Sequence, residues 1–200
     1  AWGERARNAA VLFFRALGRM AFPARLSADE SAWSIPLVRP HDPLGWVCPV
    51  LLAALVILAI SRLSSRRPAA LGFLWLCLAS LPTSNLPFPT GTIFAERLAY
   101  LPSAGFCLIA ASWICGATRS GSGAELSLRR RVLLAGVALT FSARTVIRNP
   151  VWDSDEALFS NLVRVSPGSA KAHYDFAYMN AEKGDQRTAL RHYTRATEIY

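Results

Sequence analysis

The sequence is basic and apolar, and its composition excludes an ordinary soluble domain. Of its 200 residues, 52% are hydrophobic and only 18% are charged, against about 25% charged in typical soluble domains. The net charge of +9 comes from the part before Pro150, where 16 arginines stand against 6 acidic residues. These arginines lie in short links between apolar runs, which argues against a nucleic-acid-binding protein.

The two ends and the cysteines restrict the interpretation further. The chain starts at Ala1 and ends inside a predicted repeat, so we expect it to be a fragment of a longer protein. All the cysteines lie within apolar runs, without CxxC or Cys/His spacing. This favours small buried side chains over a zinc site or a disulfide framework, and no metal site is predicted.

The first predicted element is a helix over residues 8–22 that lies in the membrane interface. Its apolar run contains Arg15 and Arg19, which share one helix face and make a full span unfavourable. We expect both arginines to face lipid headgroups. A signal-peptide core is the alternative, but no clean small-residue cleavage site follows Pro23. Residues 23–43, with four prolines, are predicted to form a loop.

Four membrane spans are predicted next, over residues 44–61, 69–82, 98–118 and 132–147. The first is uncharged and nearly long enough to cross a hydrocarbon core of about 30 Å. The last contains Arg144 near its far end, where a long side chain reaches the interface. These elements predict an all-α fold, with a polytopic transmembrane helical bundle over residues 1–150.

The distribution of arginine predicts the topology of these spans. Three arginines lie within residues 62–67, after the first span, and four lie within residues 119–131, after the third. Short arginine-rich links stay cytoplasmic. We therefore expect residues 82–97, the loop 23–43 and everything after residue 147 to lie on the opposite side.

Residues 151–200 change to the pattern of soluble amphipathic helices. Asp153 and Glu156 form a D-x-x-E sequence, typical of a capping box, ahead of a helix that Pro167 ends. Two further helices, over residues 170–183 and 186–200, are predicted to form a hairpin.

The hairpin has the residue pattern of a tetratricopeptide repeat, with small residues where two helices pack closely and an aromatic residue between units. The match is incomplete, because His173 stands where the pattern prefers Trp and Asn180 where it prefers Tyr. A generic helical hairpin is the alternative. One repeat does not bury its own face, so we expect further repeats beyond Tyr200. The residues predicted to pack the repeat are Ala177, Gly184, Ala189, Tyr193 and Ala196.

The most unusual stretch is the proline-rich segment 82–105, which contains Glu96 and Arg97 beside a span. Non-helical backbone at membrane depth needs surrounding protein or a watery cavity, and ionisable residues there tend to be functional. Arg97 is a candidate to bind a phosphate through its planar fork of donors. Glu96 would orient Arg97 or contact an acceptor. A structural ion pair at the end of a span is the alternative.

Three stretches resemble the transmembrane and tetratricopeptide-repeat (TMTC) family of protein O-mannosyltransferases and its bacterial relatives. They are RLSADESAWSIPLVRPHDP, NLPFPTGTIFAERLAYLPSAGFC and VWDSDEALFSNLVRVSPGSAKAHYDFAYMNAEKGD, in the family's order. The AERLAYLPS core is the most specific part. The resemblance implies a C-type glycosyltransferase fold, a multispan enzyme that transfers mannose or a related sugar to protein Ser/Thr hydroxyls on the lumenal or periplasmic face.

The resemblance also implies roles for individual residues. Arg97, Glu96 and Tyr100 match the segment that would bind the donor phosphate. The acidic catalytic residue of this fold class lies in the first extracytoplasmic loop, so the catalytic base is expected upstream of Ala1. The carboxylates of the loop 23–43 are interpreted as loop residues without a catalytic role: Asp29, Glu30 and Asp42.

The expected ligands follow from the same resemblance. The donor is a dolichyl- or undecaprenyl-phosphate sugar, no cofactor is tightly bound, and a divalent metal at the departing phosphate is left open. The partners are membrane lipid and an acceptor protein that the repeats would contact. The membrane is a bacterial inner membrane or the endoplasmic reticulum. A non-catalytic membrane scaffold, whose repeats recruit a partner protein, remains the alternative function.

Overall fold

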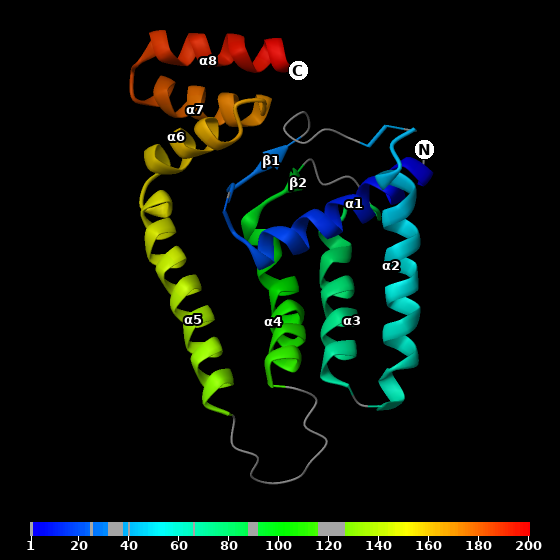
Figure 1. The fold of residues 1–200 in the computed structure, drawn as a ribbon. Coiled ribbons are helices and arrows are strands. Elements are labelled where there is room, and N and C mark those ends of the chain that lie inside the picture. Colours follow the sequence, from blue (N-terminus) through cyan, green and yellow to red (C-terminus); the bar gives the residue numbers. More distant parts are fainter. Residues whose placement is uncertain are drawn as a thin grey trace.

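The computed structural model is built from helices that run alongside one another, with a helical hairpin stacked beyond one end (Figure 1). It describes residues 2–24, 26–31, 38–39, 41–65, 67–87, 92–115 and 127–200. The predicted all-α fold class is confirmed, and only two short strands depart from it in this part of the chain. In chain order the elements are α1 (Trp2–Ala21), β1 (Glu30–Ser31), α2 (Leu44–Ser61), η1 (Leu63–Ser65), α3 (Pro68–Ser80), η2 (Leu81–Thr83), β2 (Thr92–Phe94), η3 (Glu96–Ala99), α4 (Tyr100–Cys115), α5 (Leu128–Arg148), η4 (Asn149–Trp152), α6 (Asp155–Val165), α7 (Ala170–Glu182) and α8 (Gln186–Ile199).

Helices α2 to α5 form the apolar part and correspond to the four predicted spans. Three helical stretches are long and apolar enough to cross a membrane, namely Leu44–Ser61, Glu96–Cys115 and Leu128–Trp152. The apolar stretch Pro68–Thr83 is shorter. These helices are those of a membrane protein. Residues 116–118 of the third predicted span lie outside the described residues.

The closest packing in this part lies between α3 and α4. A Cβ atom at Gly105 would come within 2.3 Å of the Gly72 carbonyl oxygen, and one at Gly72 within 2.7 Å of the Gly105 oxygen. The two glycines therefore let the helix backbones touch, as small residues do between membrane helices. The indole Nε1 of Trp75 also donates to the carbonyl of Leu101 at 3.0 Å.

Helix α1 lies across the ends of α2, α3 and α4 rather than alongside them (Figure 1). It begins at Trp2, six residues before the predicted start, because the charged residues that precede the apolar run are good helix formers. Ala10 and Val11 pack against Cys48 of α2 in a small buried cluster. The position of α1 in a membrane interface stays a prediction. All four cysteines are free, and Cys48 is buried whereas Cys107 is exposed.

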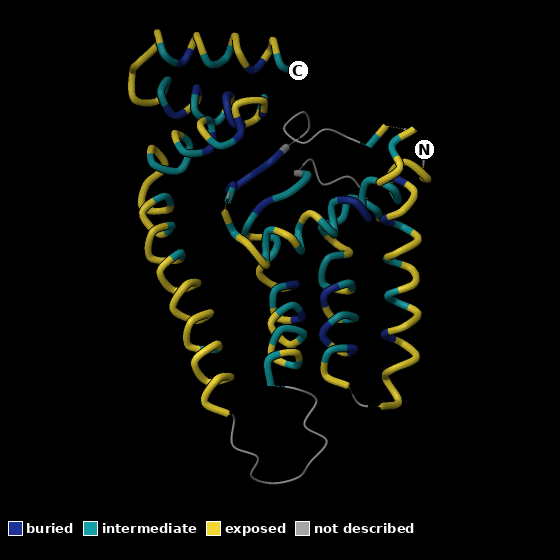
Figure 2. Tube along the Cα trace, in the orientation of Figure 1, coloured by how far each residue is buried: buried dark blue, intermediate teal, exposed yellow. Residues whose placement is uncertain are grey.

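The predicted loop over residues 23–43 contains the first of the two strands. Strand β1 pairs with β2 in an antiparallel ladder in which Glu30 stands opposite Phe94 and Ser31 opposite Thr92. The ladder ties this segment to the entry of α4, and Figure 2 shows that the chain around β1 is buried while α5 is largely exposed.

The carboxy-terminal helices α6, α7 and α8 each begin at a polar cap. Ser154, Ser169 and Asp185 accept hydrogen bonds from backbone amides of the first turns. The predicted capping box of Asp153 and Glu156 is therefore wrong, because the Ser154 hydroxyl takes the N-cap position one residue later.

Helices α7 and α8 coincide within one residue with the predicted hairpin. Ala177, Ala189 and Ala196 are buried, and Gly184 in the turn has a φ of +86°, which favours glycine. Tyr193 lies edge-on to Tyr174, with ring centroids 5.4 Å apart. The tetratricopeptide assignment itself stays a prediction.

Candidate functional site

The candidate site is built around the turn from β2 into α4, where Glu96 starts the 3-10 turn η3. The preceding Ala95 is extended and fully buried. The Glu96 amide donates to the carbonyl of Ser27 at 3.1 Å, which fixes the turn against residues 26–31. The extended backbone of residues 92–95 and the start of η3 are thus supported by other parts of the protein.

Glu96 binds Arg148 of α5 and not its neighbour Arg97. Arg148 Nη2 lies 2.8 Å from Glu96 Oε1 and Nε lies 3.2 Å from Oε2, while Nη1 donates to Asn161 Oδ1 at 2.8 Å. The side chains of Glu96 and Arg148 are only 15% and 12% exposed, so water screens this bidentate pair weakly. Glu96 therefore forms a structural ion pair, as the alternative prediction had it, but its partner is Arg148 on α5.

Arg97 takes no part in this pair and remains accessible. Its side chain is 59% exposed, and Nη2 lies 3.6 Å from Asp29 Oδ2, a separation beyond hydrogen-bonding range. Tyr100, one turn further on at the start of α4, is 83% exposed. The contact with Asp29 therefore leaves the guanidinium donors of Arg97 unoccupied by that carboxylate.

Asp29 and Glu30, interpreted from the sequence as loop residues, are buried and bind cations. Asp29 Oδ2 accepts from Lys171 Nζ of α7 at 2.5 Å. Glu30 Oε2 accepts from Arg19 Nη1 of α1 at 2.8 Å, and the Arg19 guanidinium lies over the Phe94 ring at 4.4 Å. The sequence interpretation named no partners for them, because these partners come from distant parts of the chain. Arg19 consequently faces protein rather than the expected headgroups.

These side chains form one charged layer between the apolar helices and the hairpin. Arg144 joins it by donating to the carbonyls of Pro23 and Ala24 at 2.8 and 2.7 Å. Basic side chains outnumber carboxylates in the layer, so it carries an excess of positive charge. The charged layer comprises Arg19, Asp29, Glu30, Glu96, Arg97, Arg144, Arg148 and Lys171.

An apolar groove of about 570 Å³ runs between α4 and α5 below the charged layer. Its lower walls are apolar side chains such as Phe106 and Val137, and its upper end meets polar members of the charged layer. This combination suits an amphipathic ligand with an anionic head and a hydrocarbon tail. The charged side chains that line the groove are Arg19, Glu96, Arg144 and Arg148.

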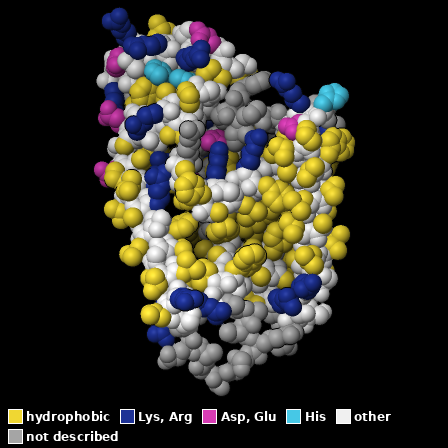
Figure 3. Space-filling model, viewed as in Figure 1, with side chains coloured by type: hydrophobic (Ala, Val, Ile, Leu, Met, Phe, Trp, Pro, Cys, Tyr) yellow, Lys and Arg dark blue, Asp and Glu magenta, His cyan; other side chains and the backbone are white. Residues whose placement is uncertain are grey.

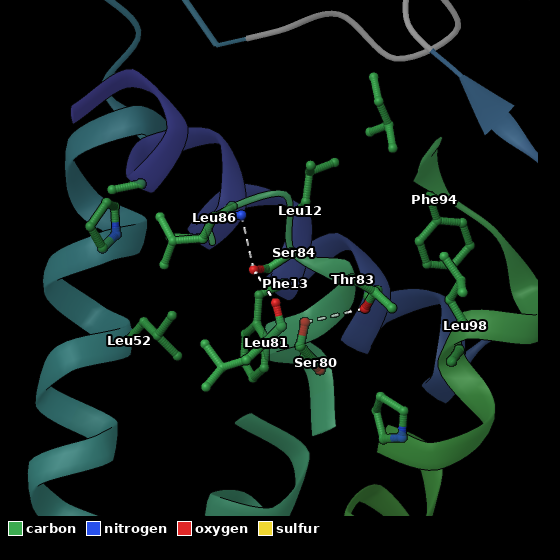
Figure 4. A pocket seen from close by; sticks show the side chains of 18 of the residues that line it. Leu12, Phe13, Leu52, Ser80, Leu81, Thr83, Ser84, Leu86, Phe94 and Leu98 are labelled. Carbon is green, nitrogen blue, oxygen red and sulfur yellow. Dashed lines mark hydrogen bonds between the residues drawn. The ribbon is translucent and has the colours of Figure 1, made fainter. Parts of the chain in front are cut away.

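A second apolar cavity, of about 320 Å³, lies beneath α1 (Figure 4). Leu12 and Phe13 of α1, Leu52 of α2 and the turn around Leu81 line it. Hydrogen bonds within this turn hold its shape, including Ser84 Oγ to the Leu81 carbonyl at 2.7 Å. The two spaces share three lining residues, which form a common wall: Met20, Phe94 and Ala99.

The molecular surface repeats this division. Figure 3 shows apolar side chains gathered over the middle of one face, with Lys and Arg side chains above and below them. Such a band is typical of a surface that meets lipid between two headgroup layers.

The structure brings only part of the predicted site together. Glu96 lines the groove, whereas Arg97 and Tyr100 lie outside its lining and are exposed. The sequence prediction missed Arg148 and Lys171, for which no local pattern gives a signal. The part of the chain that the structure describes holds no group of three or more His, Cys, Asp or Glu side chains placed for a metal ion.

Burial affects the titration of one acid beside the layer. Burial raises the pKa of Asp175 on α7 above its ordinary value, while nearby Lys171 lowers this pKa and Asp29 raises it. The electrostatic interactions of the charged layer therefore extend to Asp175 on α7, the first helix of the hairpin.

Curated relatives match most of this chain. It is 35% identical to the protein O-mannosyl-transferase TMTC1 of Mus musculus over 188 residues, which is 89% of this chain and 19% of that protein. It is 36% identical to the protein O-mannosyl-transferase TMTC4 of Homo sapiens over 185 residues, 86% of this chain and 24% of the relative. The protein O-mannosyl-transferase Tmtc3 of Drosophila melanogaster is 35% identical over 127 residues, 62% of this chain and 13% of the relative.

The similarity covers only a segment of these relatives. No protein-family profile matches the chain, and no solved structure matches it significantly. The chain spans about a fifth of the length of the first of these relatives and about a quarter of the second. Over this shared segment, with its membrane helices, charged layer and helical hairpin, the chain belongs to the TMTC family of proteins.

Proposed function

We propose that this chain is part of a membrane glycosyltransferase that transfers mannose or a related sugar from a polyprenyl-phosphate donor to Ser/Thr hydroxyls of proteins. The name of the curated relatives, protein O-mannosyl-transferase, supports the reaction class. The observation that carries the donor class is the groove between α4 and α5, which is apolar along its walls and basic at its head. A phosphate with a long hydrocarbon chain has the same division of polarity.

Arg97 is the side chain proposed to bind the donor phosphate. It lies outside the lining of the groove but belongs to the charged layer that meets the head of the groove. Its guanidinium is exposed, and its 3.6 Å contact with Asp29 leaves donors for a ligand. Arginine recognises phosphate through paired N–H donors, and the excess cations of the charged layer lower the cost of bringing a second anion close. Glu96, held by Arg148, acts in this proposal by fixing the turn that carries Arg97. Tyr100, three residues after Arg97 and exposed, would contact the same ligand.

The general base is proposed to lie outside this segment. A base for a hydroxyl must be free to accept a proton. The carboxylates of Asp29, Glu30 and Glu96 are each held in an ion pair with a lysine or arginine of the charged layer. They therefore suit a structural role.

We place the charged layer and the hairpin on the lumenal or periplasmic side. The ends of α2, α3, α4 and α5 that adjoin the arginine-rich links in the sequence lie together at the end of the molecule opposite α6 to α8 (Figure 1). Short arginine-rich links are retained in the cytoplasm. A cysteine introduced at Tyr200 should react with an impermeant reagent added from the lumenal or periplasmic side, and labelling from the cytosol would refute this orientation.

The donor role is tested by Arg97→Ala and Arg97→Lys in the full-length protein, reconstituted with a polyprenyl-phosphate mannose and an acceptor protein. Loss of a charged phosphate contact should raise the KM for the donor by about 10- to 100-fold, and lysine should restore part of it. Arg187→Ala, an exposed arginine on α8, is the matched control. Unimpaired transfer by Arg97→Ala at normal expression would exclude the phosphate role.

A non-catalytic scaffold is the second candidate. The observation in its favour is a pair of half-exposed tyrosines one turn apart on α7, Tyr174 and Tyr178, since tyrosine is enriched at protein interfaces. Partner capture that survives Tyr174→Ala and Tyr178→Ala would exclude this surface.

A further inference from the structure

Three charged side chains from three parts of the chain meet at Asp29. Asp29 lies just before β1, Arg97 lies in η3 at the entry to α4, and Lys171 lies in the first turn of α7. Lys171 thus brings the carboxy-terminal hairpin into contact with the segment proposed to bind the donor phosphate.

The two cations hold the same oxygen atom of Asp29 at unequal distances. Lys171 Nζ lies 2.5 Å from Oδ2, whereas Arg97 Nη2 lies 3.6 Å from it. The first is a charge-assisted hydrogen bond and the second is a longer electrostatic contact. Arg97 is also the more exposed of the two cations. Of these two cations, Lys171 therefore binds Asp29 more tightly.

The hairpin is fixed in this position by contacts besides the lysine. Ala28 packs against Leu162 of α6 and Ala172 of α7 in a buried cluster. The hydroxyls of Ser27 and Ser166 lie 3.2 Å apart in a buried hydrogen bond. Loss of the Lys171 charge therefore leaves an apolar and a polar contact that keep the hairpin in place.

We propose that Lys171 is a positioning residue for the donor site: by holding the Asp29 carboxylate, it keeps Arg97 from closing onto Asp29 and leaves Arg97 available to an anionic ligand. The hairpin then completes the site through one side chain. This inference rests on the proposed function, because it takes Arg97 as the phosphate ligand.

The physical reason is that a buried, charged carboxylate is energetically unfavourable unless a cation pairs with it. Without Lys171, the other cation described beside Asp29 is Arg97, which needs to move by less than about 1 Å to reach hydrogen-bonding distance. A guanidinium bound to Asp29 in this way offers fewer donors to a phosphate. Removal of the Asp29 charge should cancel the effect.

The test uses the full-length protein in nanodiscs, with farnesyl phosphate as the anionic lipid probe. Lys171→Met should weaken binding of the probe by about tenfold or more, and Lys171→Arg should keep it near the wild-type value. The double variant Lys171→Met with Asp29→Asn should recover binding, because Arg97 is then free again. Arg187→Ala is the control for an exposed arginine elsewhere on the hairpin.

A second measurement needs no lipid and reports the position of Arg97 directly. Phenylglyoxal modifies accessible guanidinium groups, and mass spectrometry gives the rate at each arginine. The modification of Arg97 should slow in Lys171→Met and recover in the double variant, while Arg187 reacts at a constant rate. Hydrogen exchange of α6 to α8 in each variant confirms that the hairpin stays docked.

The outcomes separate this inference from the proposed function. If Arg97→Ala binds the probe normally, the phosphate role of Arg97 fails and the positioning role fails with it. If Arg97→Ala weakens binding but Lys171→Met does not, only the positioning role is overturned. If Lys171→Met weakens binding and Asp29→Asn fails to restore it, Lys171 does not act through Asp29, which also overturns the inference.

Discussion

The ion pair between Glu96 and Arg148 is the contact whose loss should destabilise the membrane part most directly. In Glu96→Ala, Arg148 stays largely buried and keeps only Asn161 among the partners described above. Breaking a buried pair by removing one partner costs about 3–5 kcal/mol. Because Asn161 remains and Arg148 is 12% exposed, we expect the free energy of unfolding to fall by about 2–3 kcal/mol.

A double-mutant cycle separates the pair from its surroundings. Glu96→Ala, Arg148→Met and the double variant are compared by equilibrium unfolding in mixed micelles. Tryptophan fluorescence reports the transition, and Trp152 lines the same groove as Arg148. The two losses should be non-additive by about 2 kcal/mol. The exposed pair of Arg195 and Glu198 on α8 is the control and should show no measurable coupling, since exposed pairs contribute little. Additive losses at Glu96 and Arg148 would refute the reasoning.

Three further predictions concern the helix packing and the hairpin. Gly105→Ala should lower the thermal stability of the full-length protein, because its Cβ would lie 2.3 Å from the Gly72 carbonyl oxygen, whereas Gly136→Ala, with no atom within 4 Å, should not. Gly184→Ala should destabilise the hairpin by about 1–2 kcal/mol, because its φ of +86° strains any Cβ-bearing residue, and faster hydrogen exchange in α7 and α8 would show this. Burial, then the nearby His173, lowers the pKa of His192 below 6.5, so the unfolded state binds more protons just below that pH. Protection of α7 and α8 from exchange should therefore fall as the pH drops through about 6.5, and His192→Gln should flatten this dependence.

The features predicted correctly from the sequence are those that local pattern decides. The bounds of α7 and α8 follow from the spacing of alanines and from Gly184, which act within a few residues of one another. Helix α1 starts earlier than predicted, because the prediction followed the apolar run. The glutamate and arginines before that run are charged but favour a helix. The N-cap before α6 was misplaced because two neighbouring polar residues compete for one position.

The charged layer was missed because its partners are brought together only by the tertiary fold. Lys171 lies 142 residues from Asp29, and Arg148 lies 52 residues from Glu96. No periodicity links residues at such separations. Glu96 and Arg97 stand out in the sequence because ionisable groups near lipid are costly. Their different partners depend on where α5 and the segment that carries Asp29 lie.

The long separation between Asp29 and Lys171 has a consequence for biosynthesis. At roughly 5–20 residues per second, a ribosome needs about 7 to 28 s to add the 142 residues between them. During that interval Asp29 has already been synthesised, while the lysine that pairs with it is still untranslated. This part of the chain therefore reaches its final charge balance only after the hairpin has emerged, which makes the later helices a checkpoint for assembly of the earlier ones.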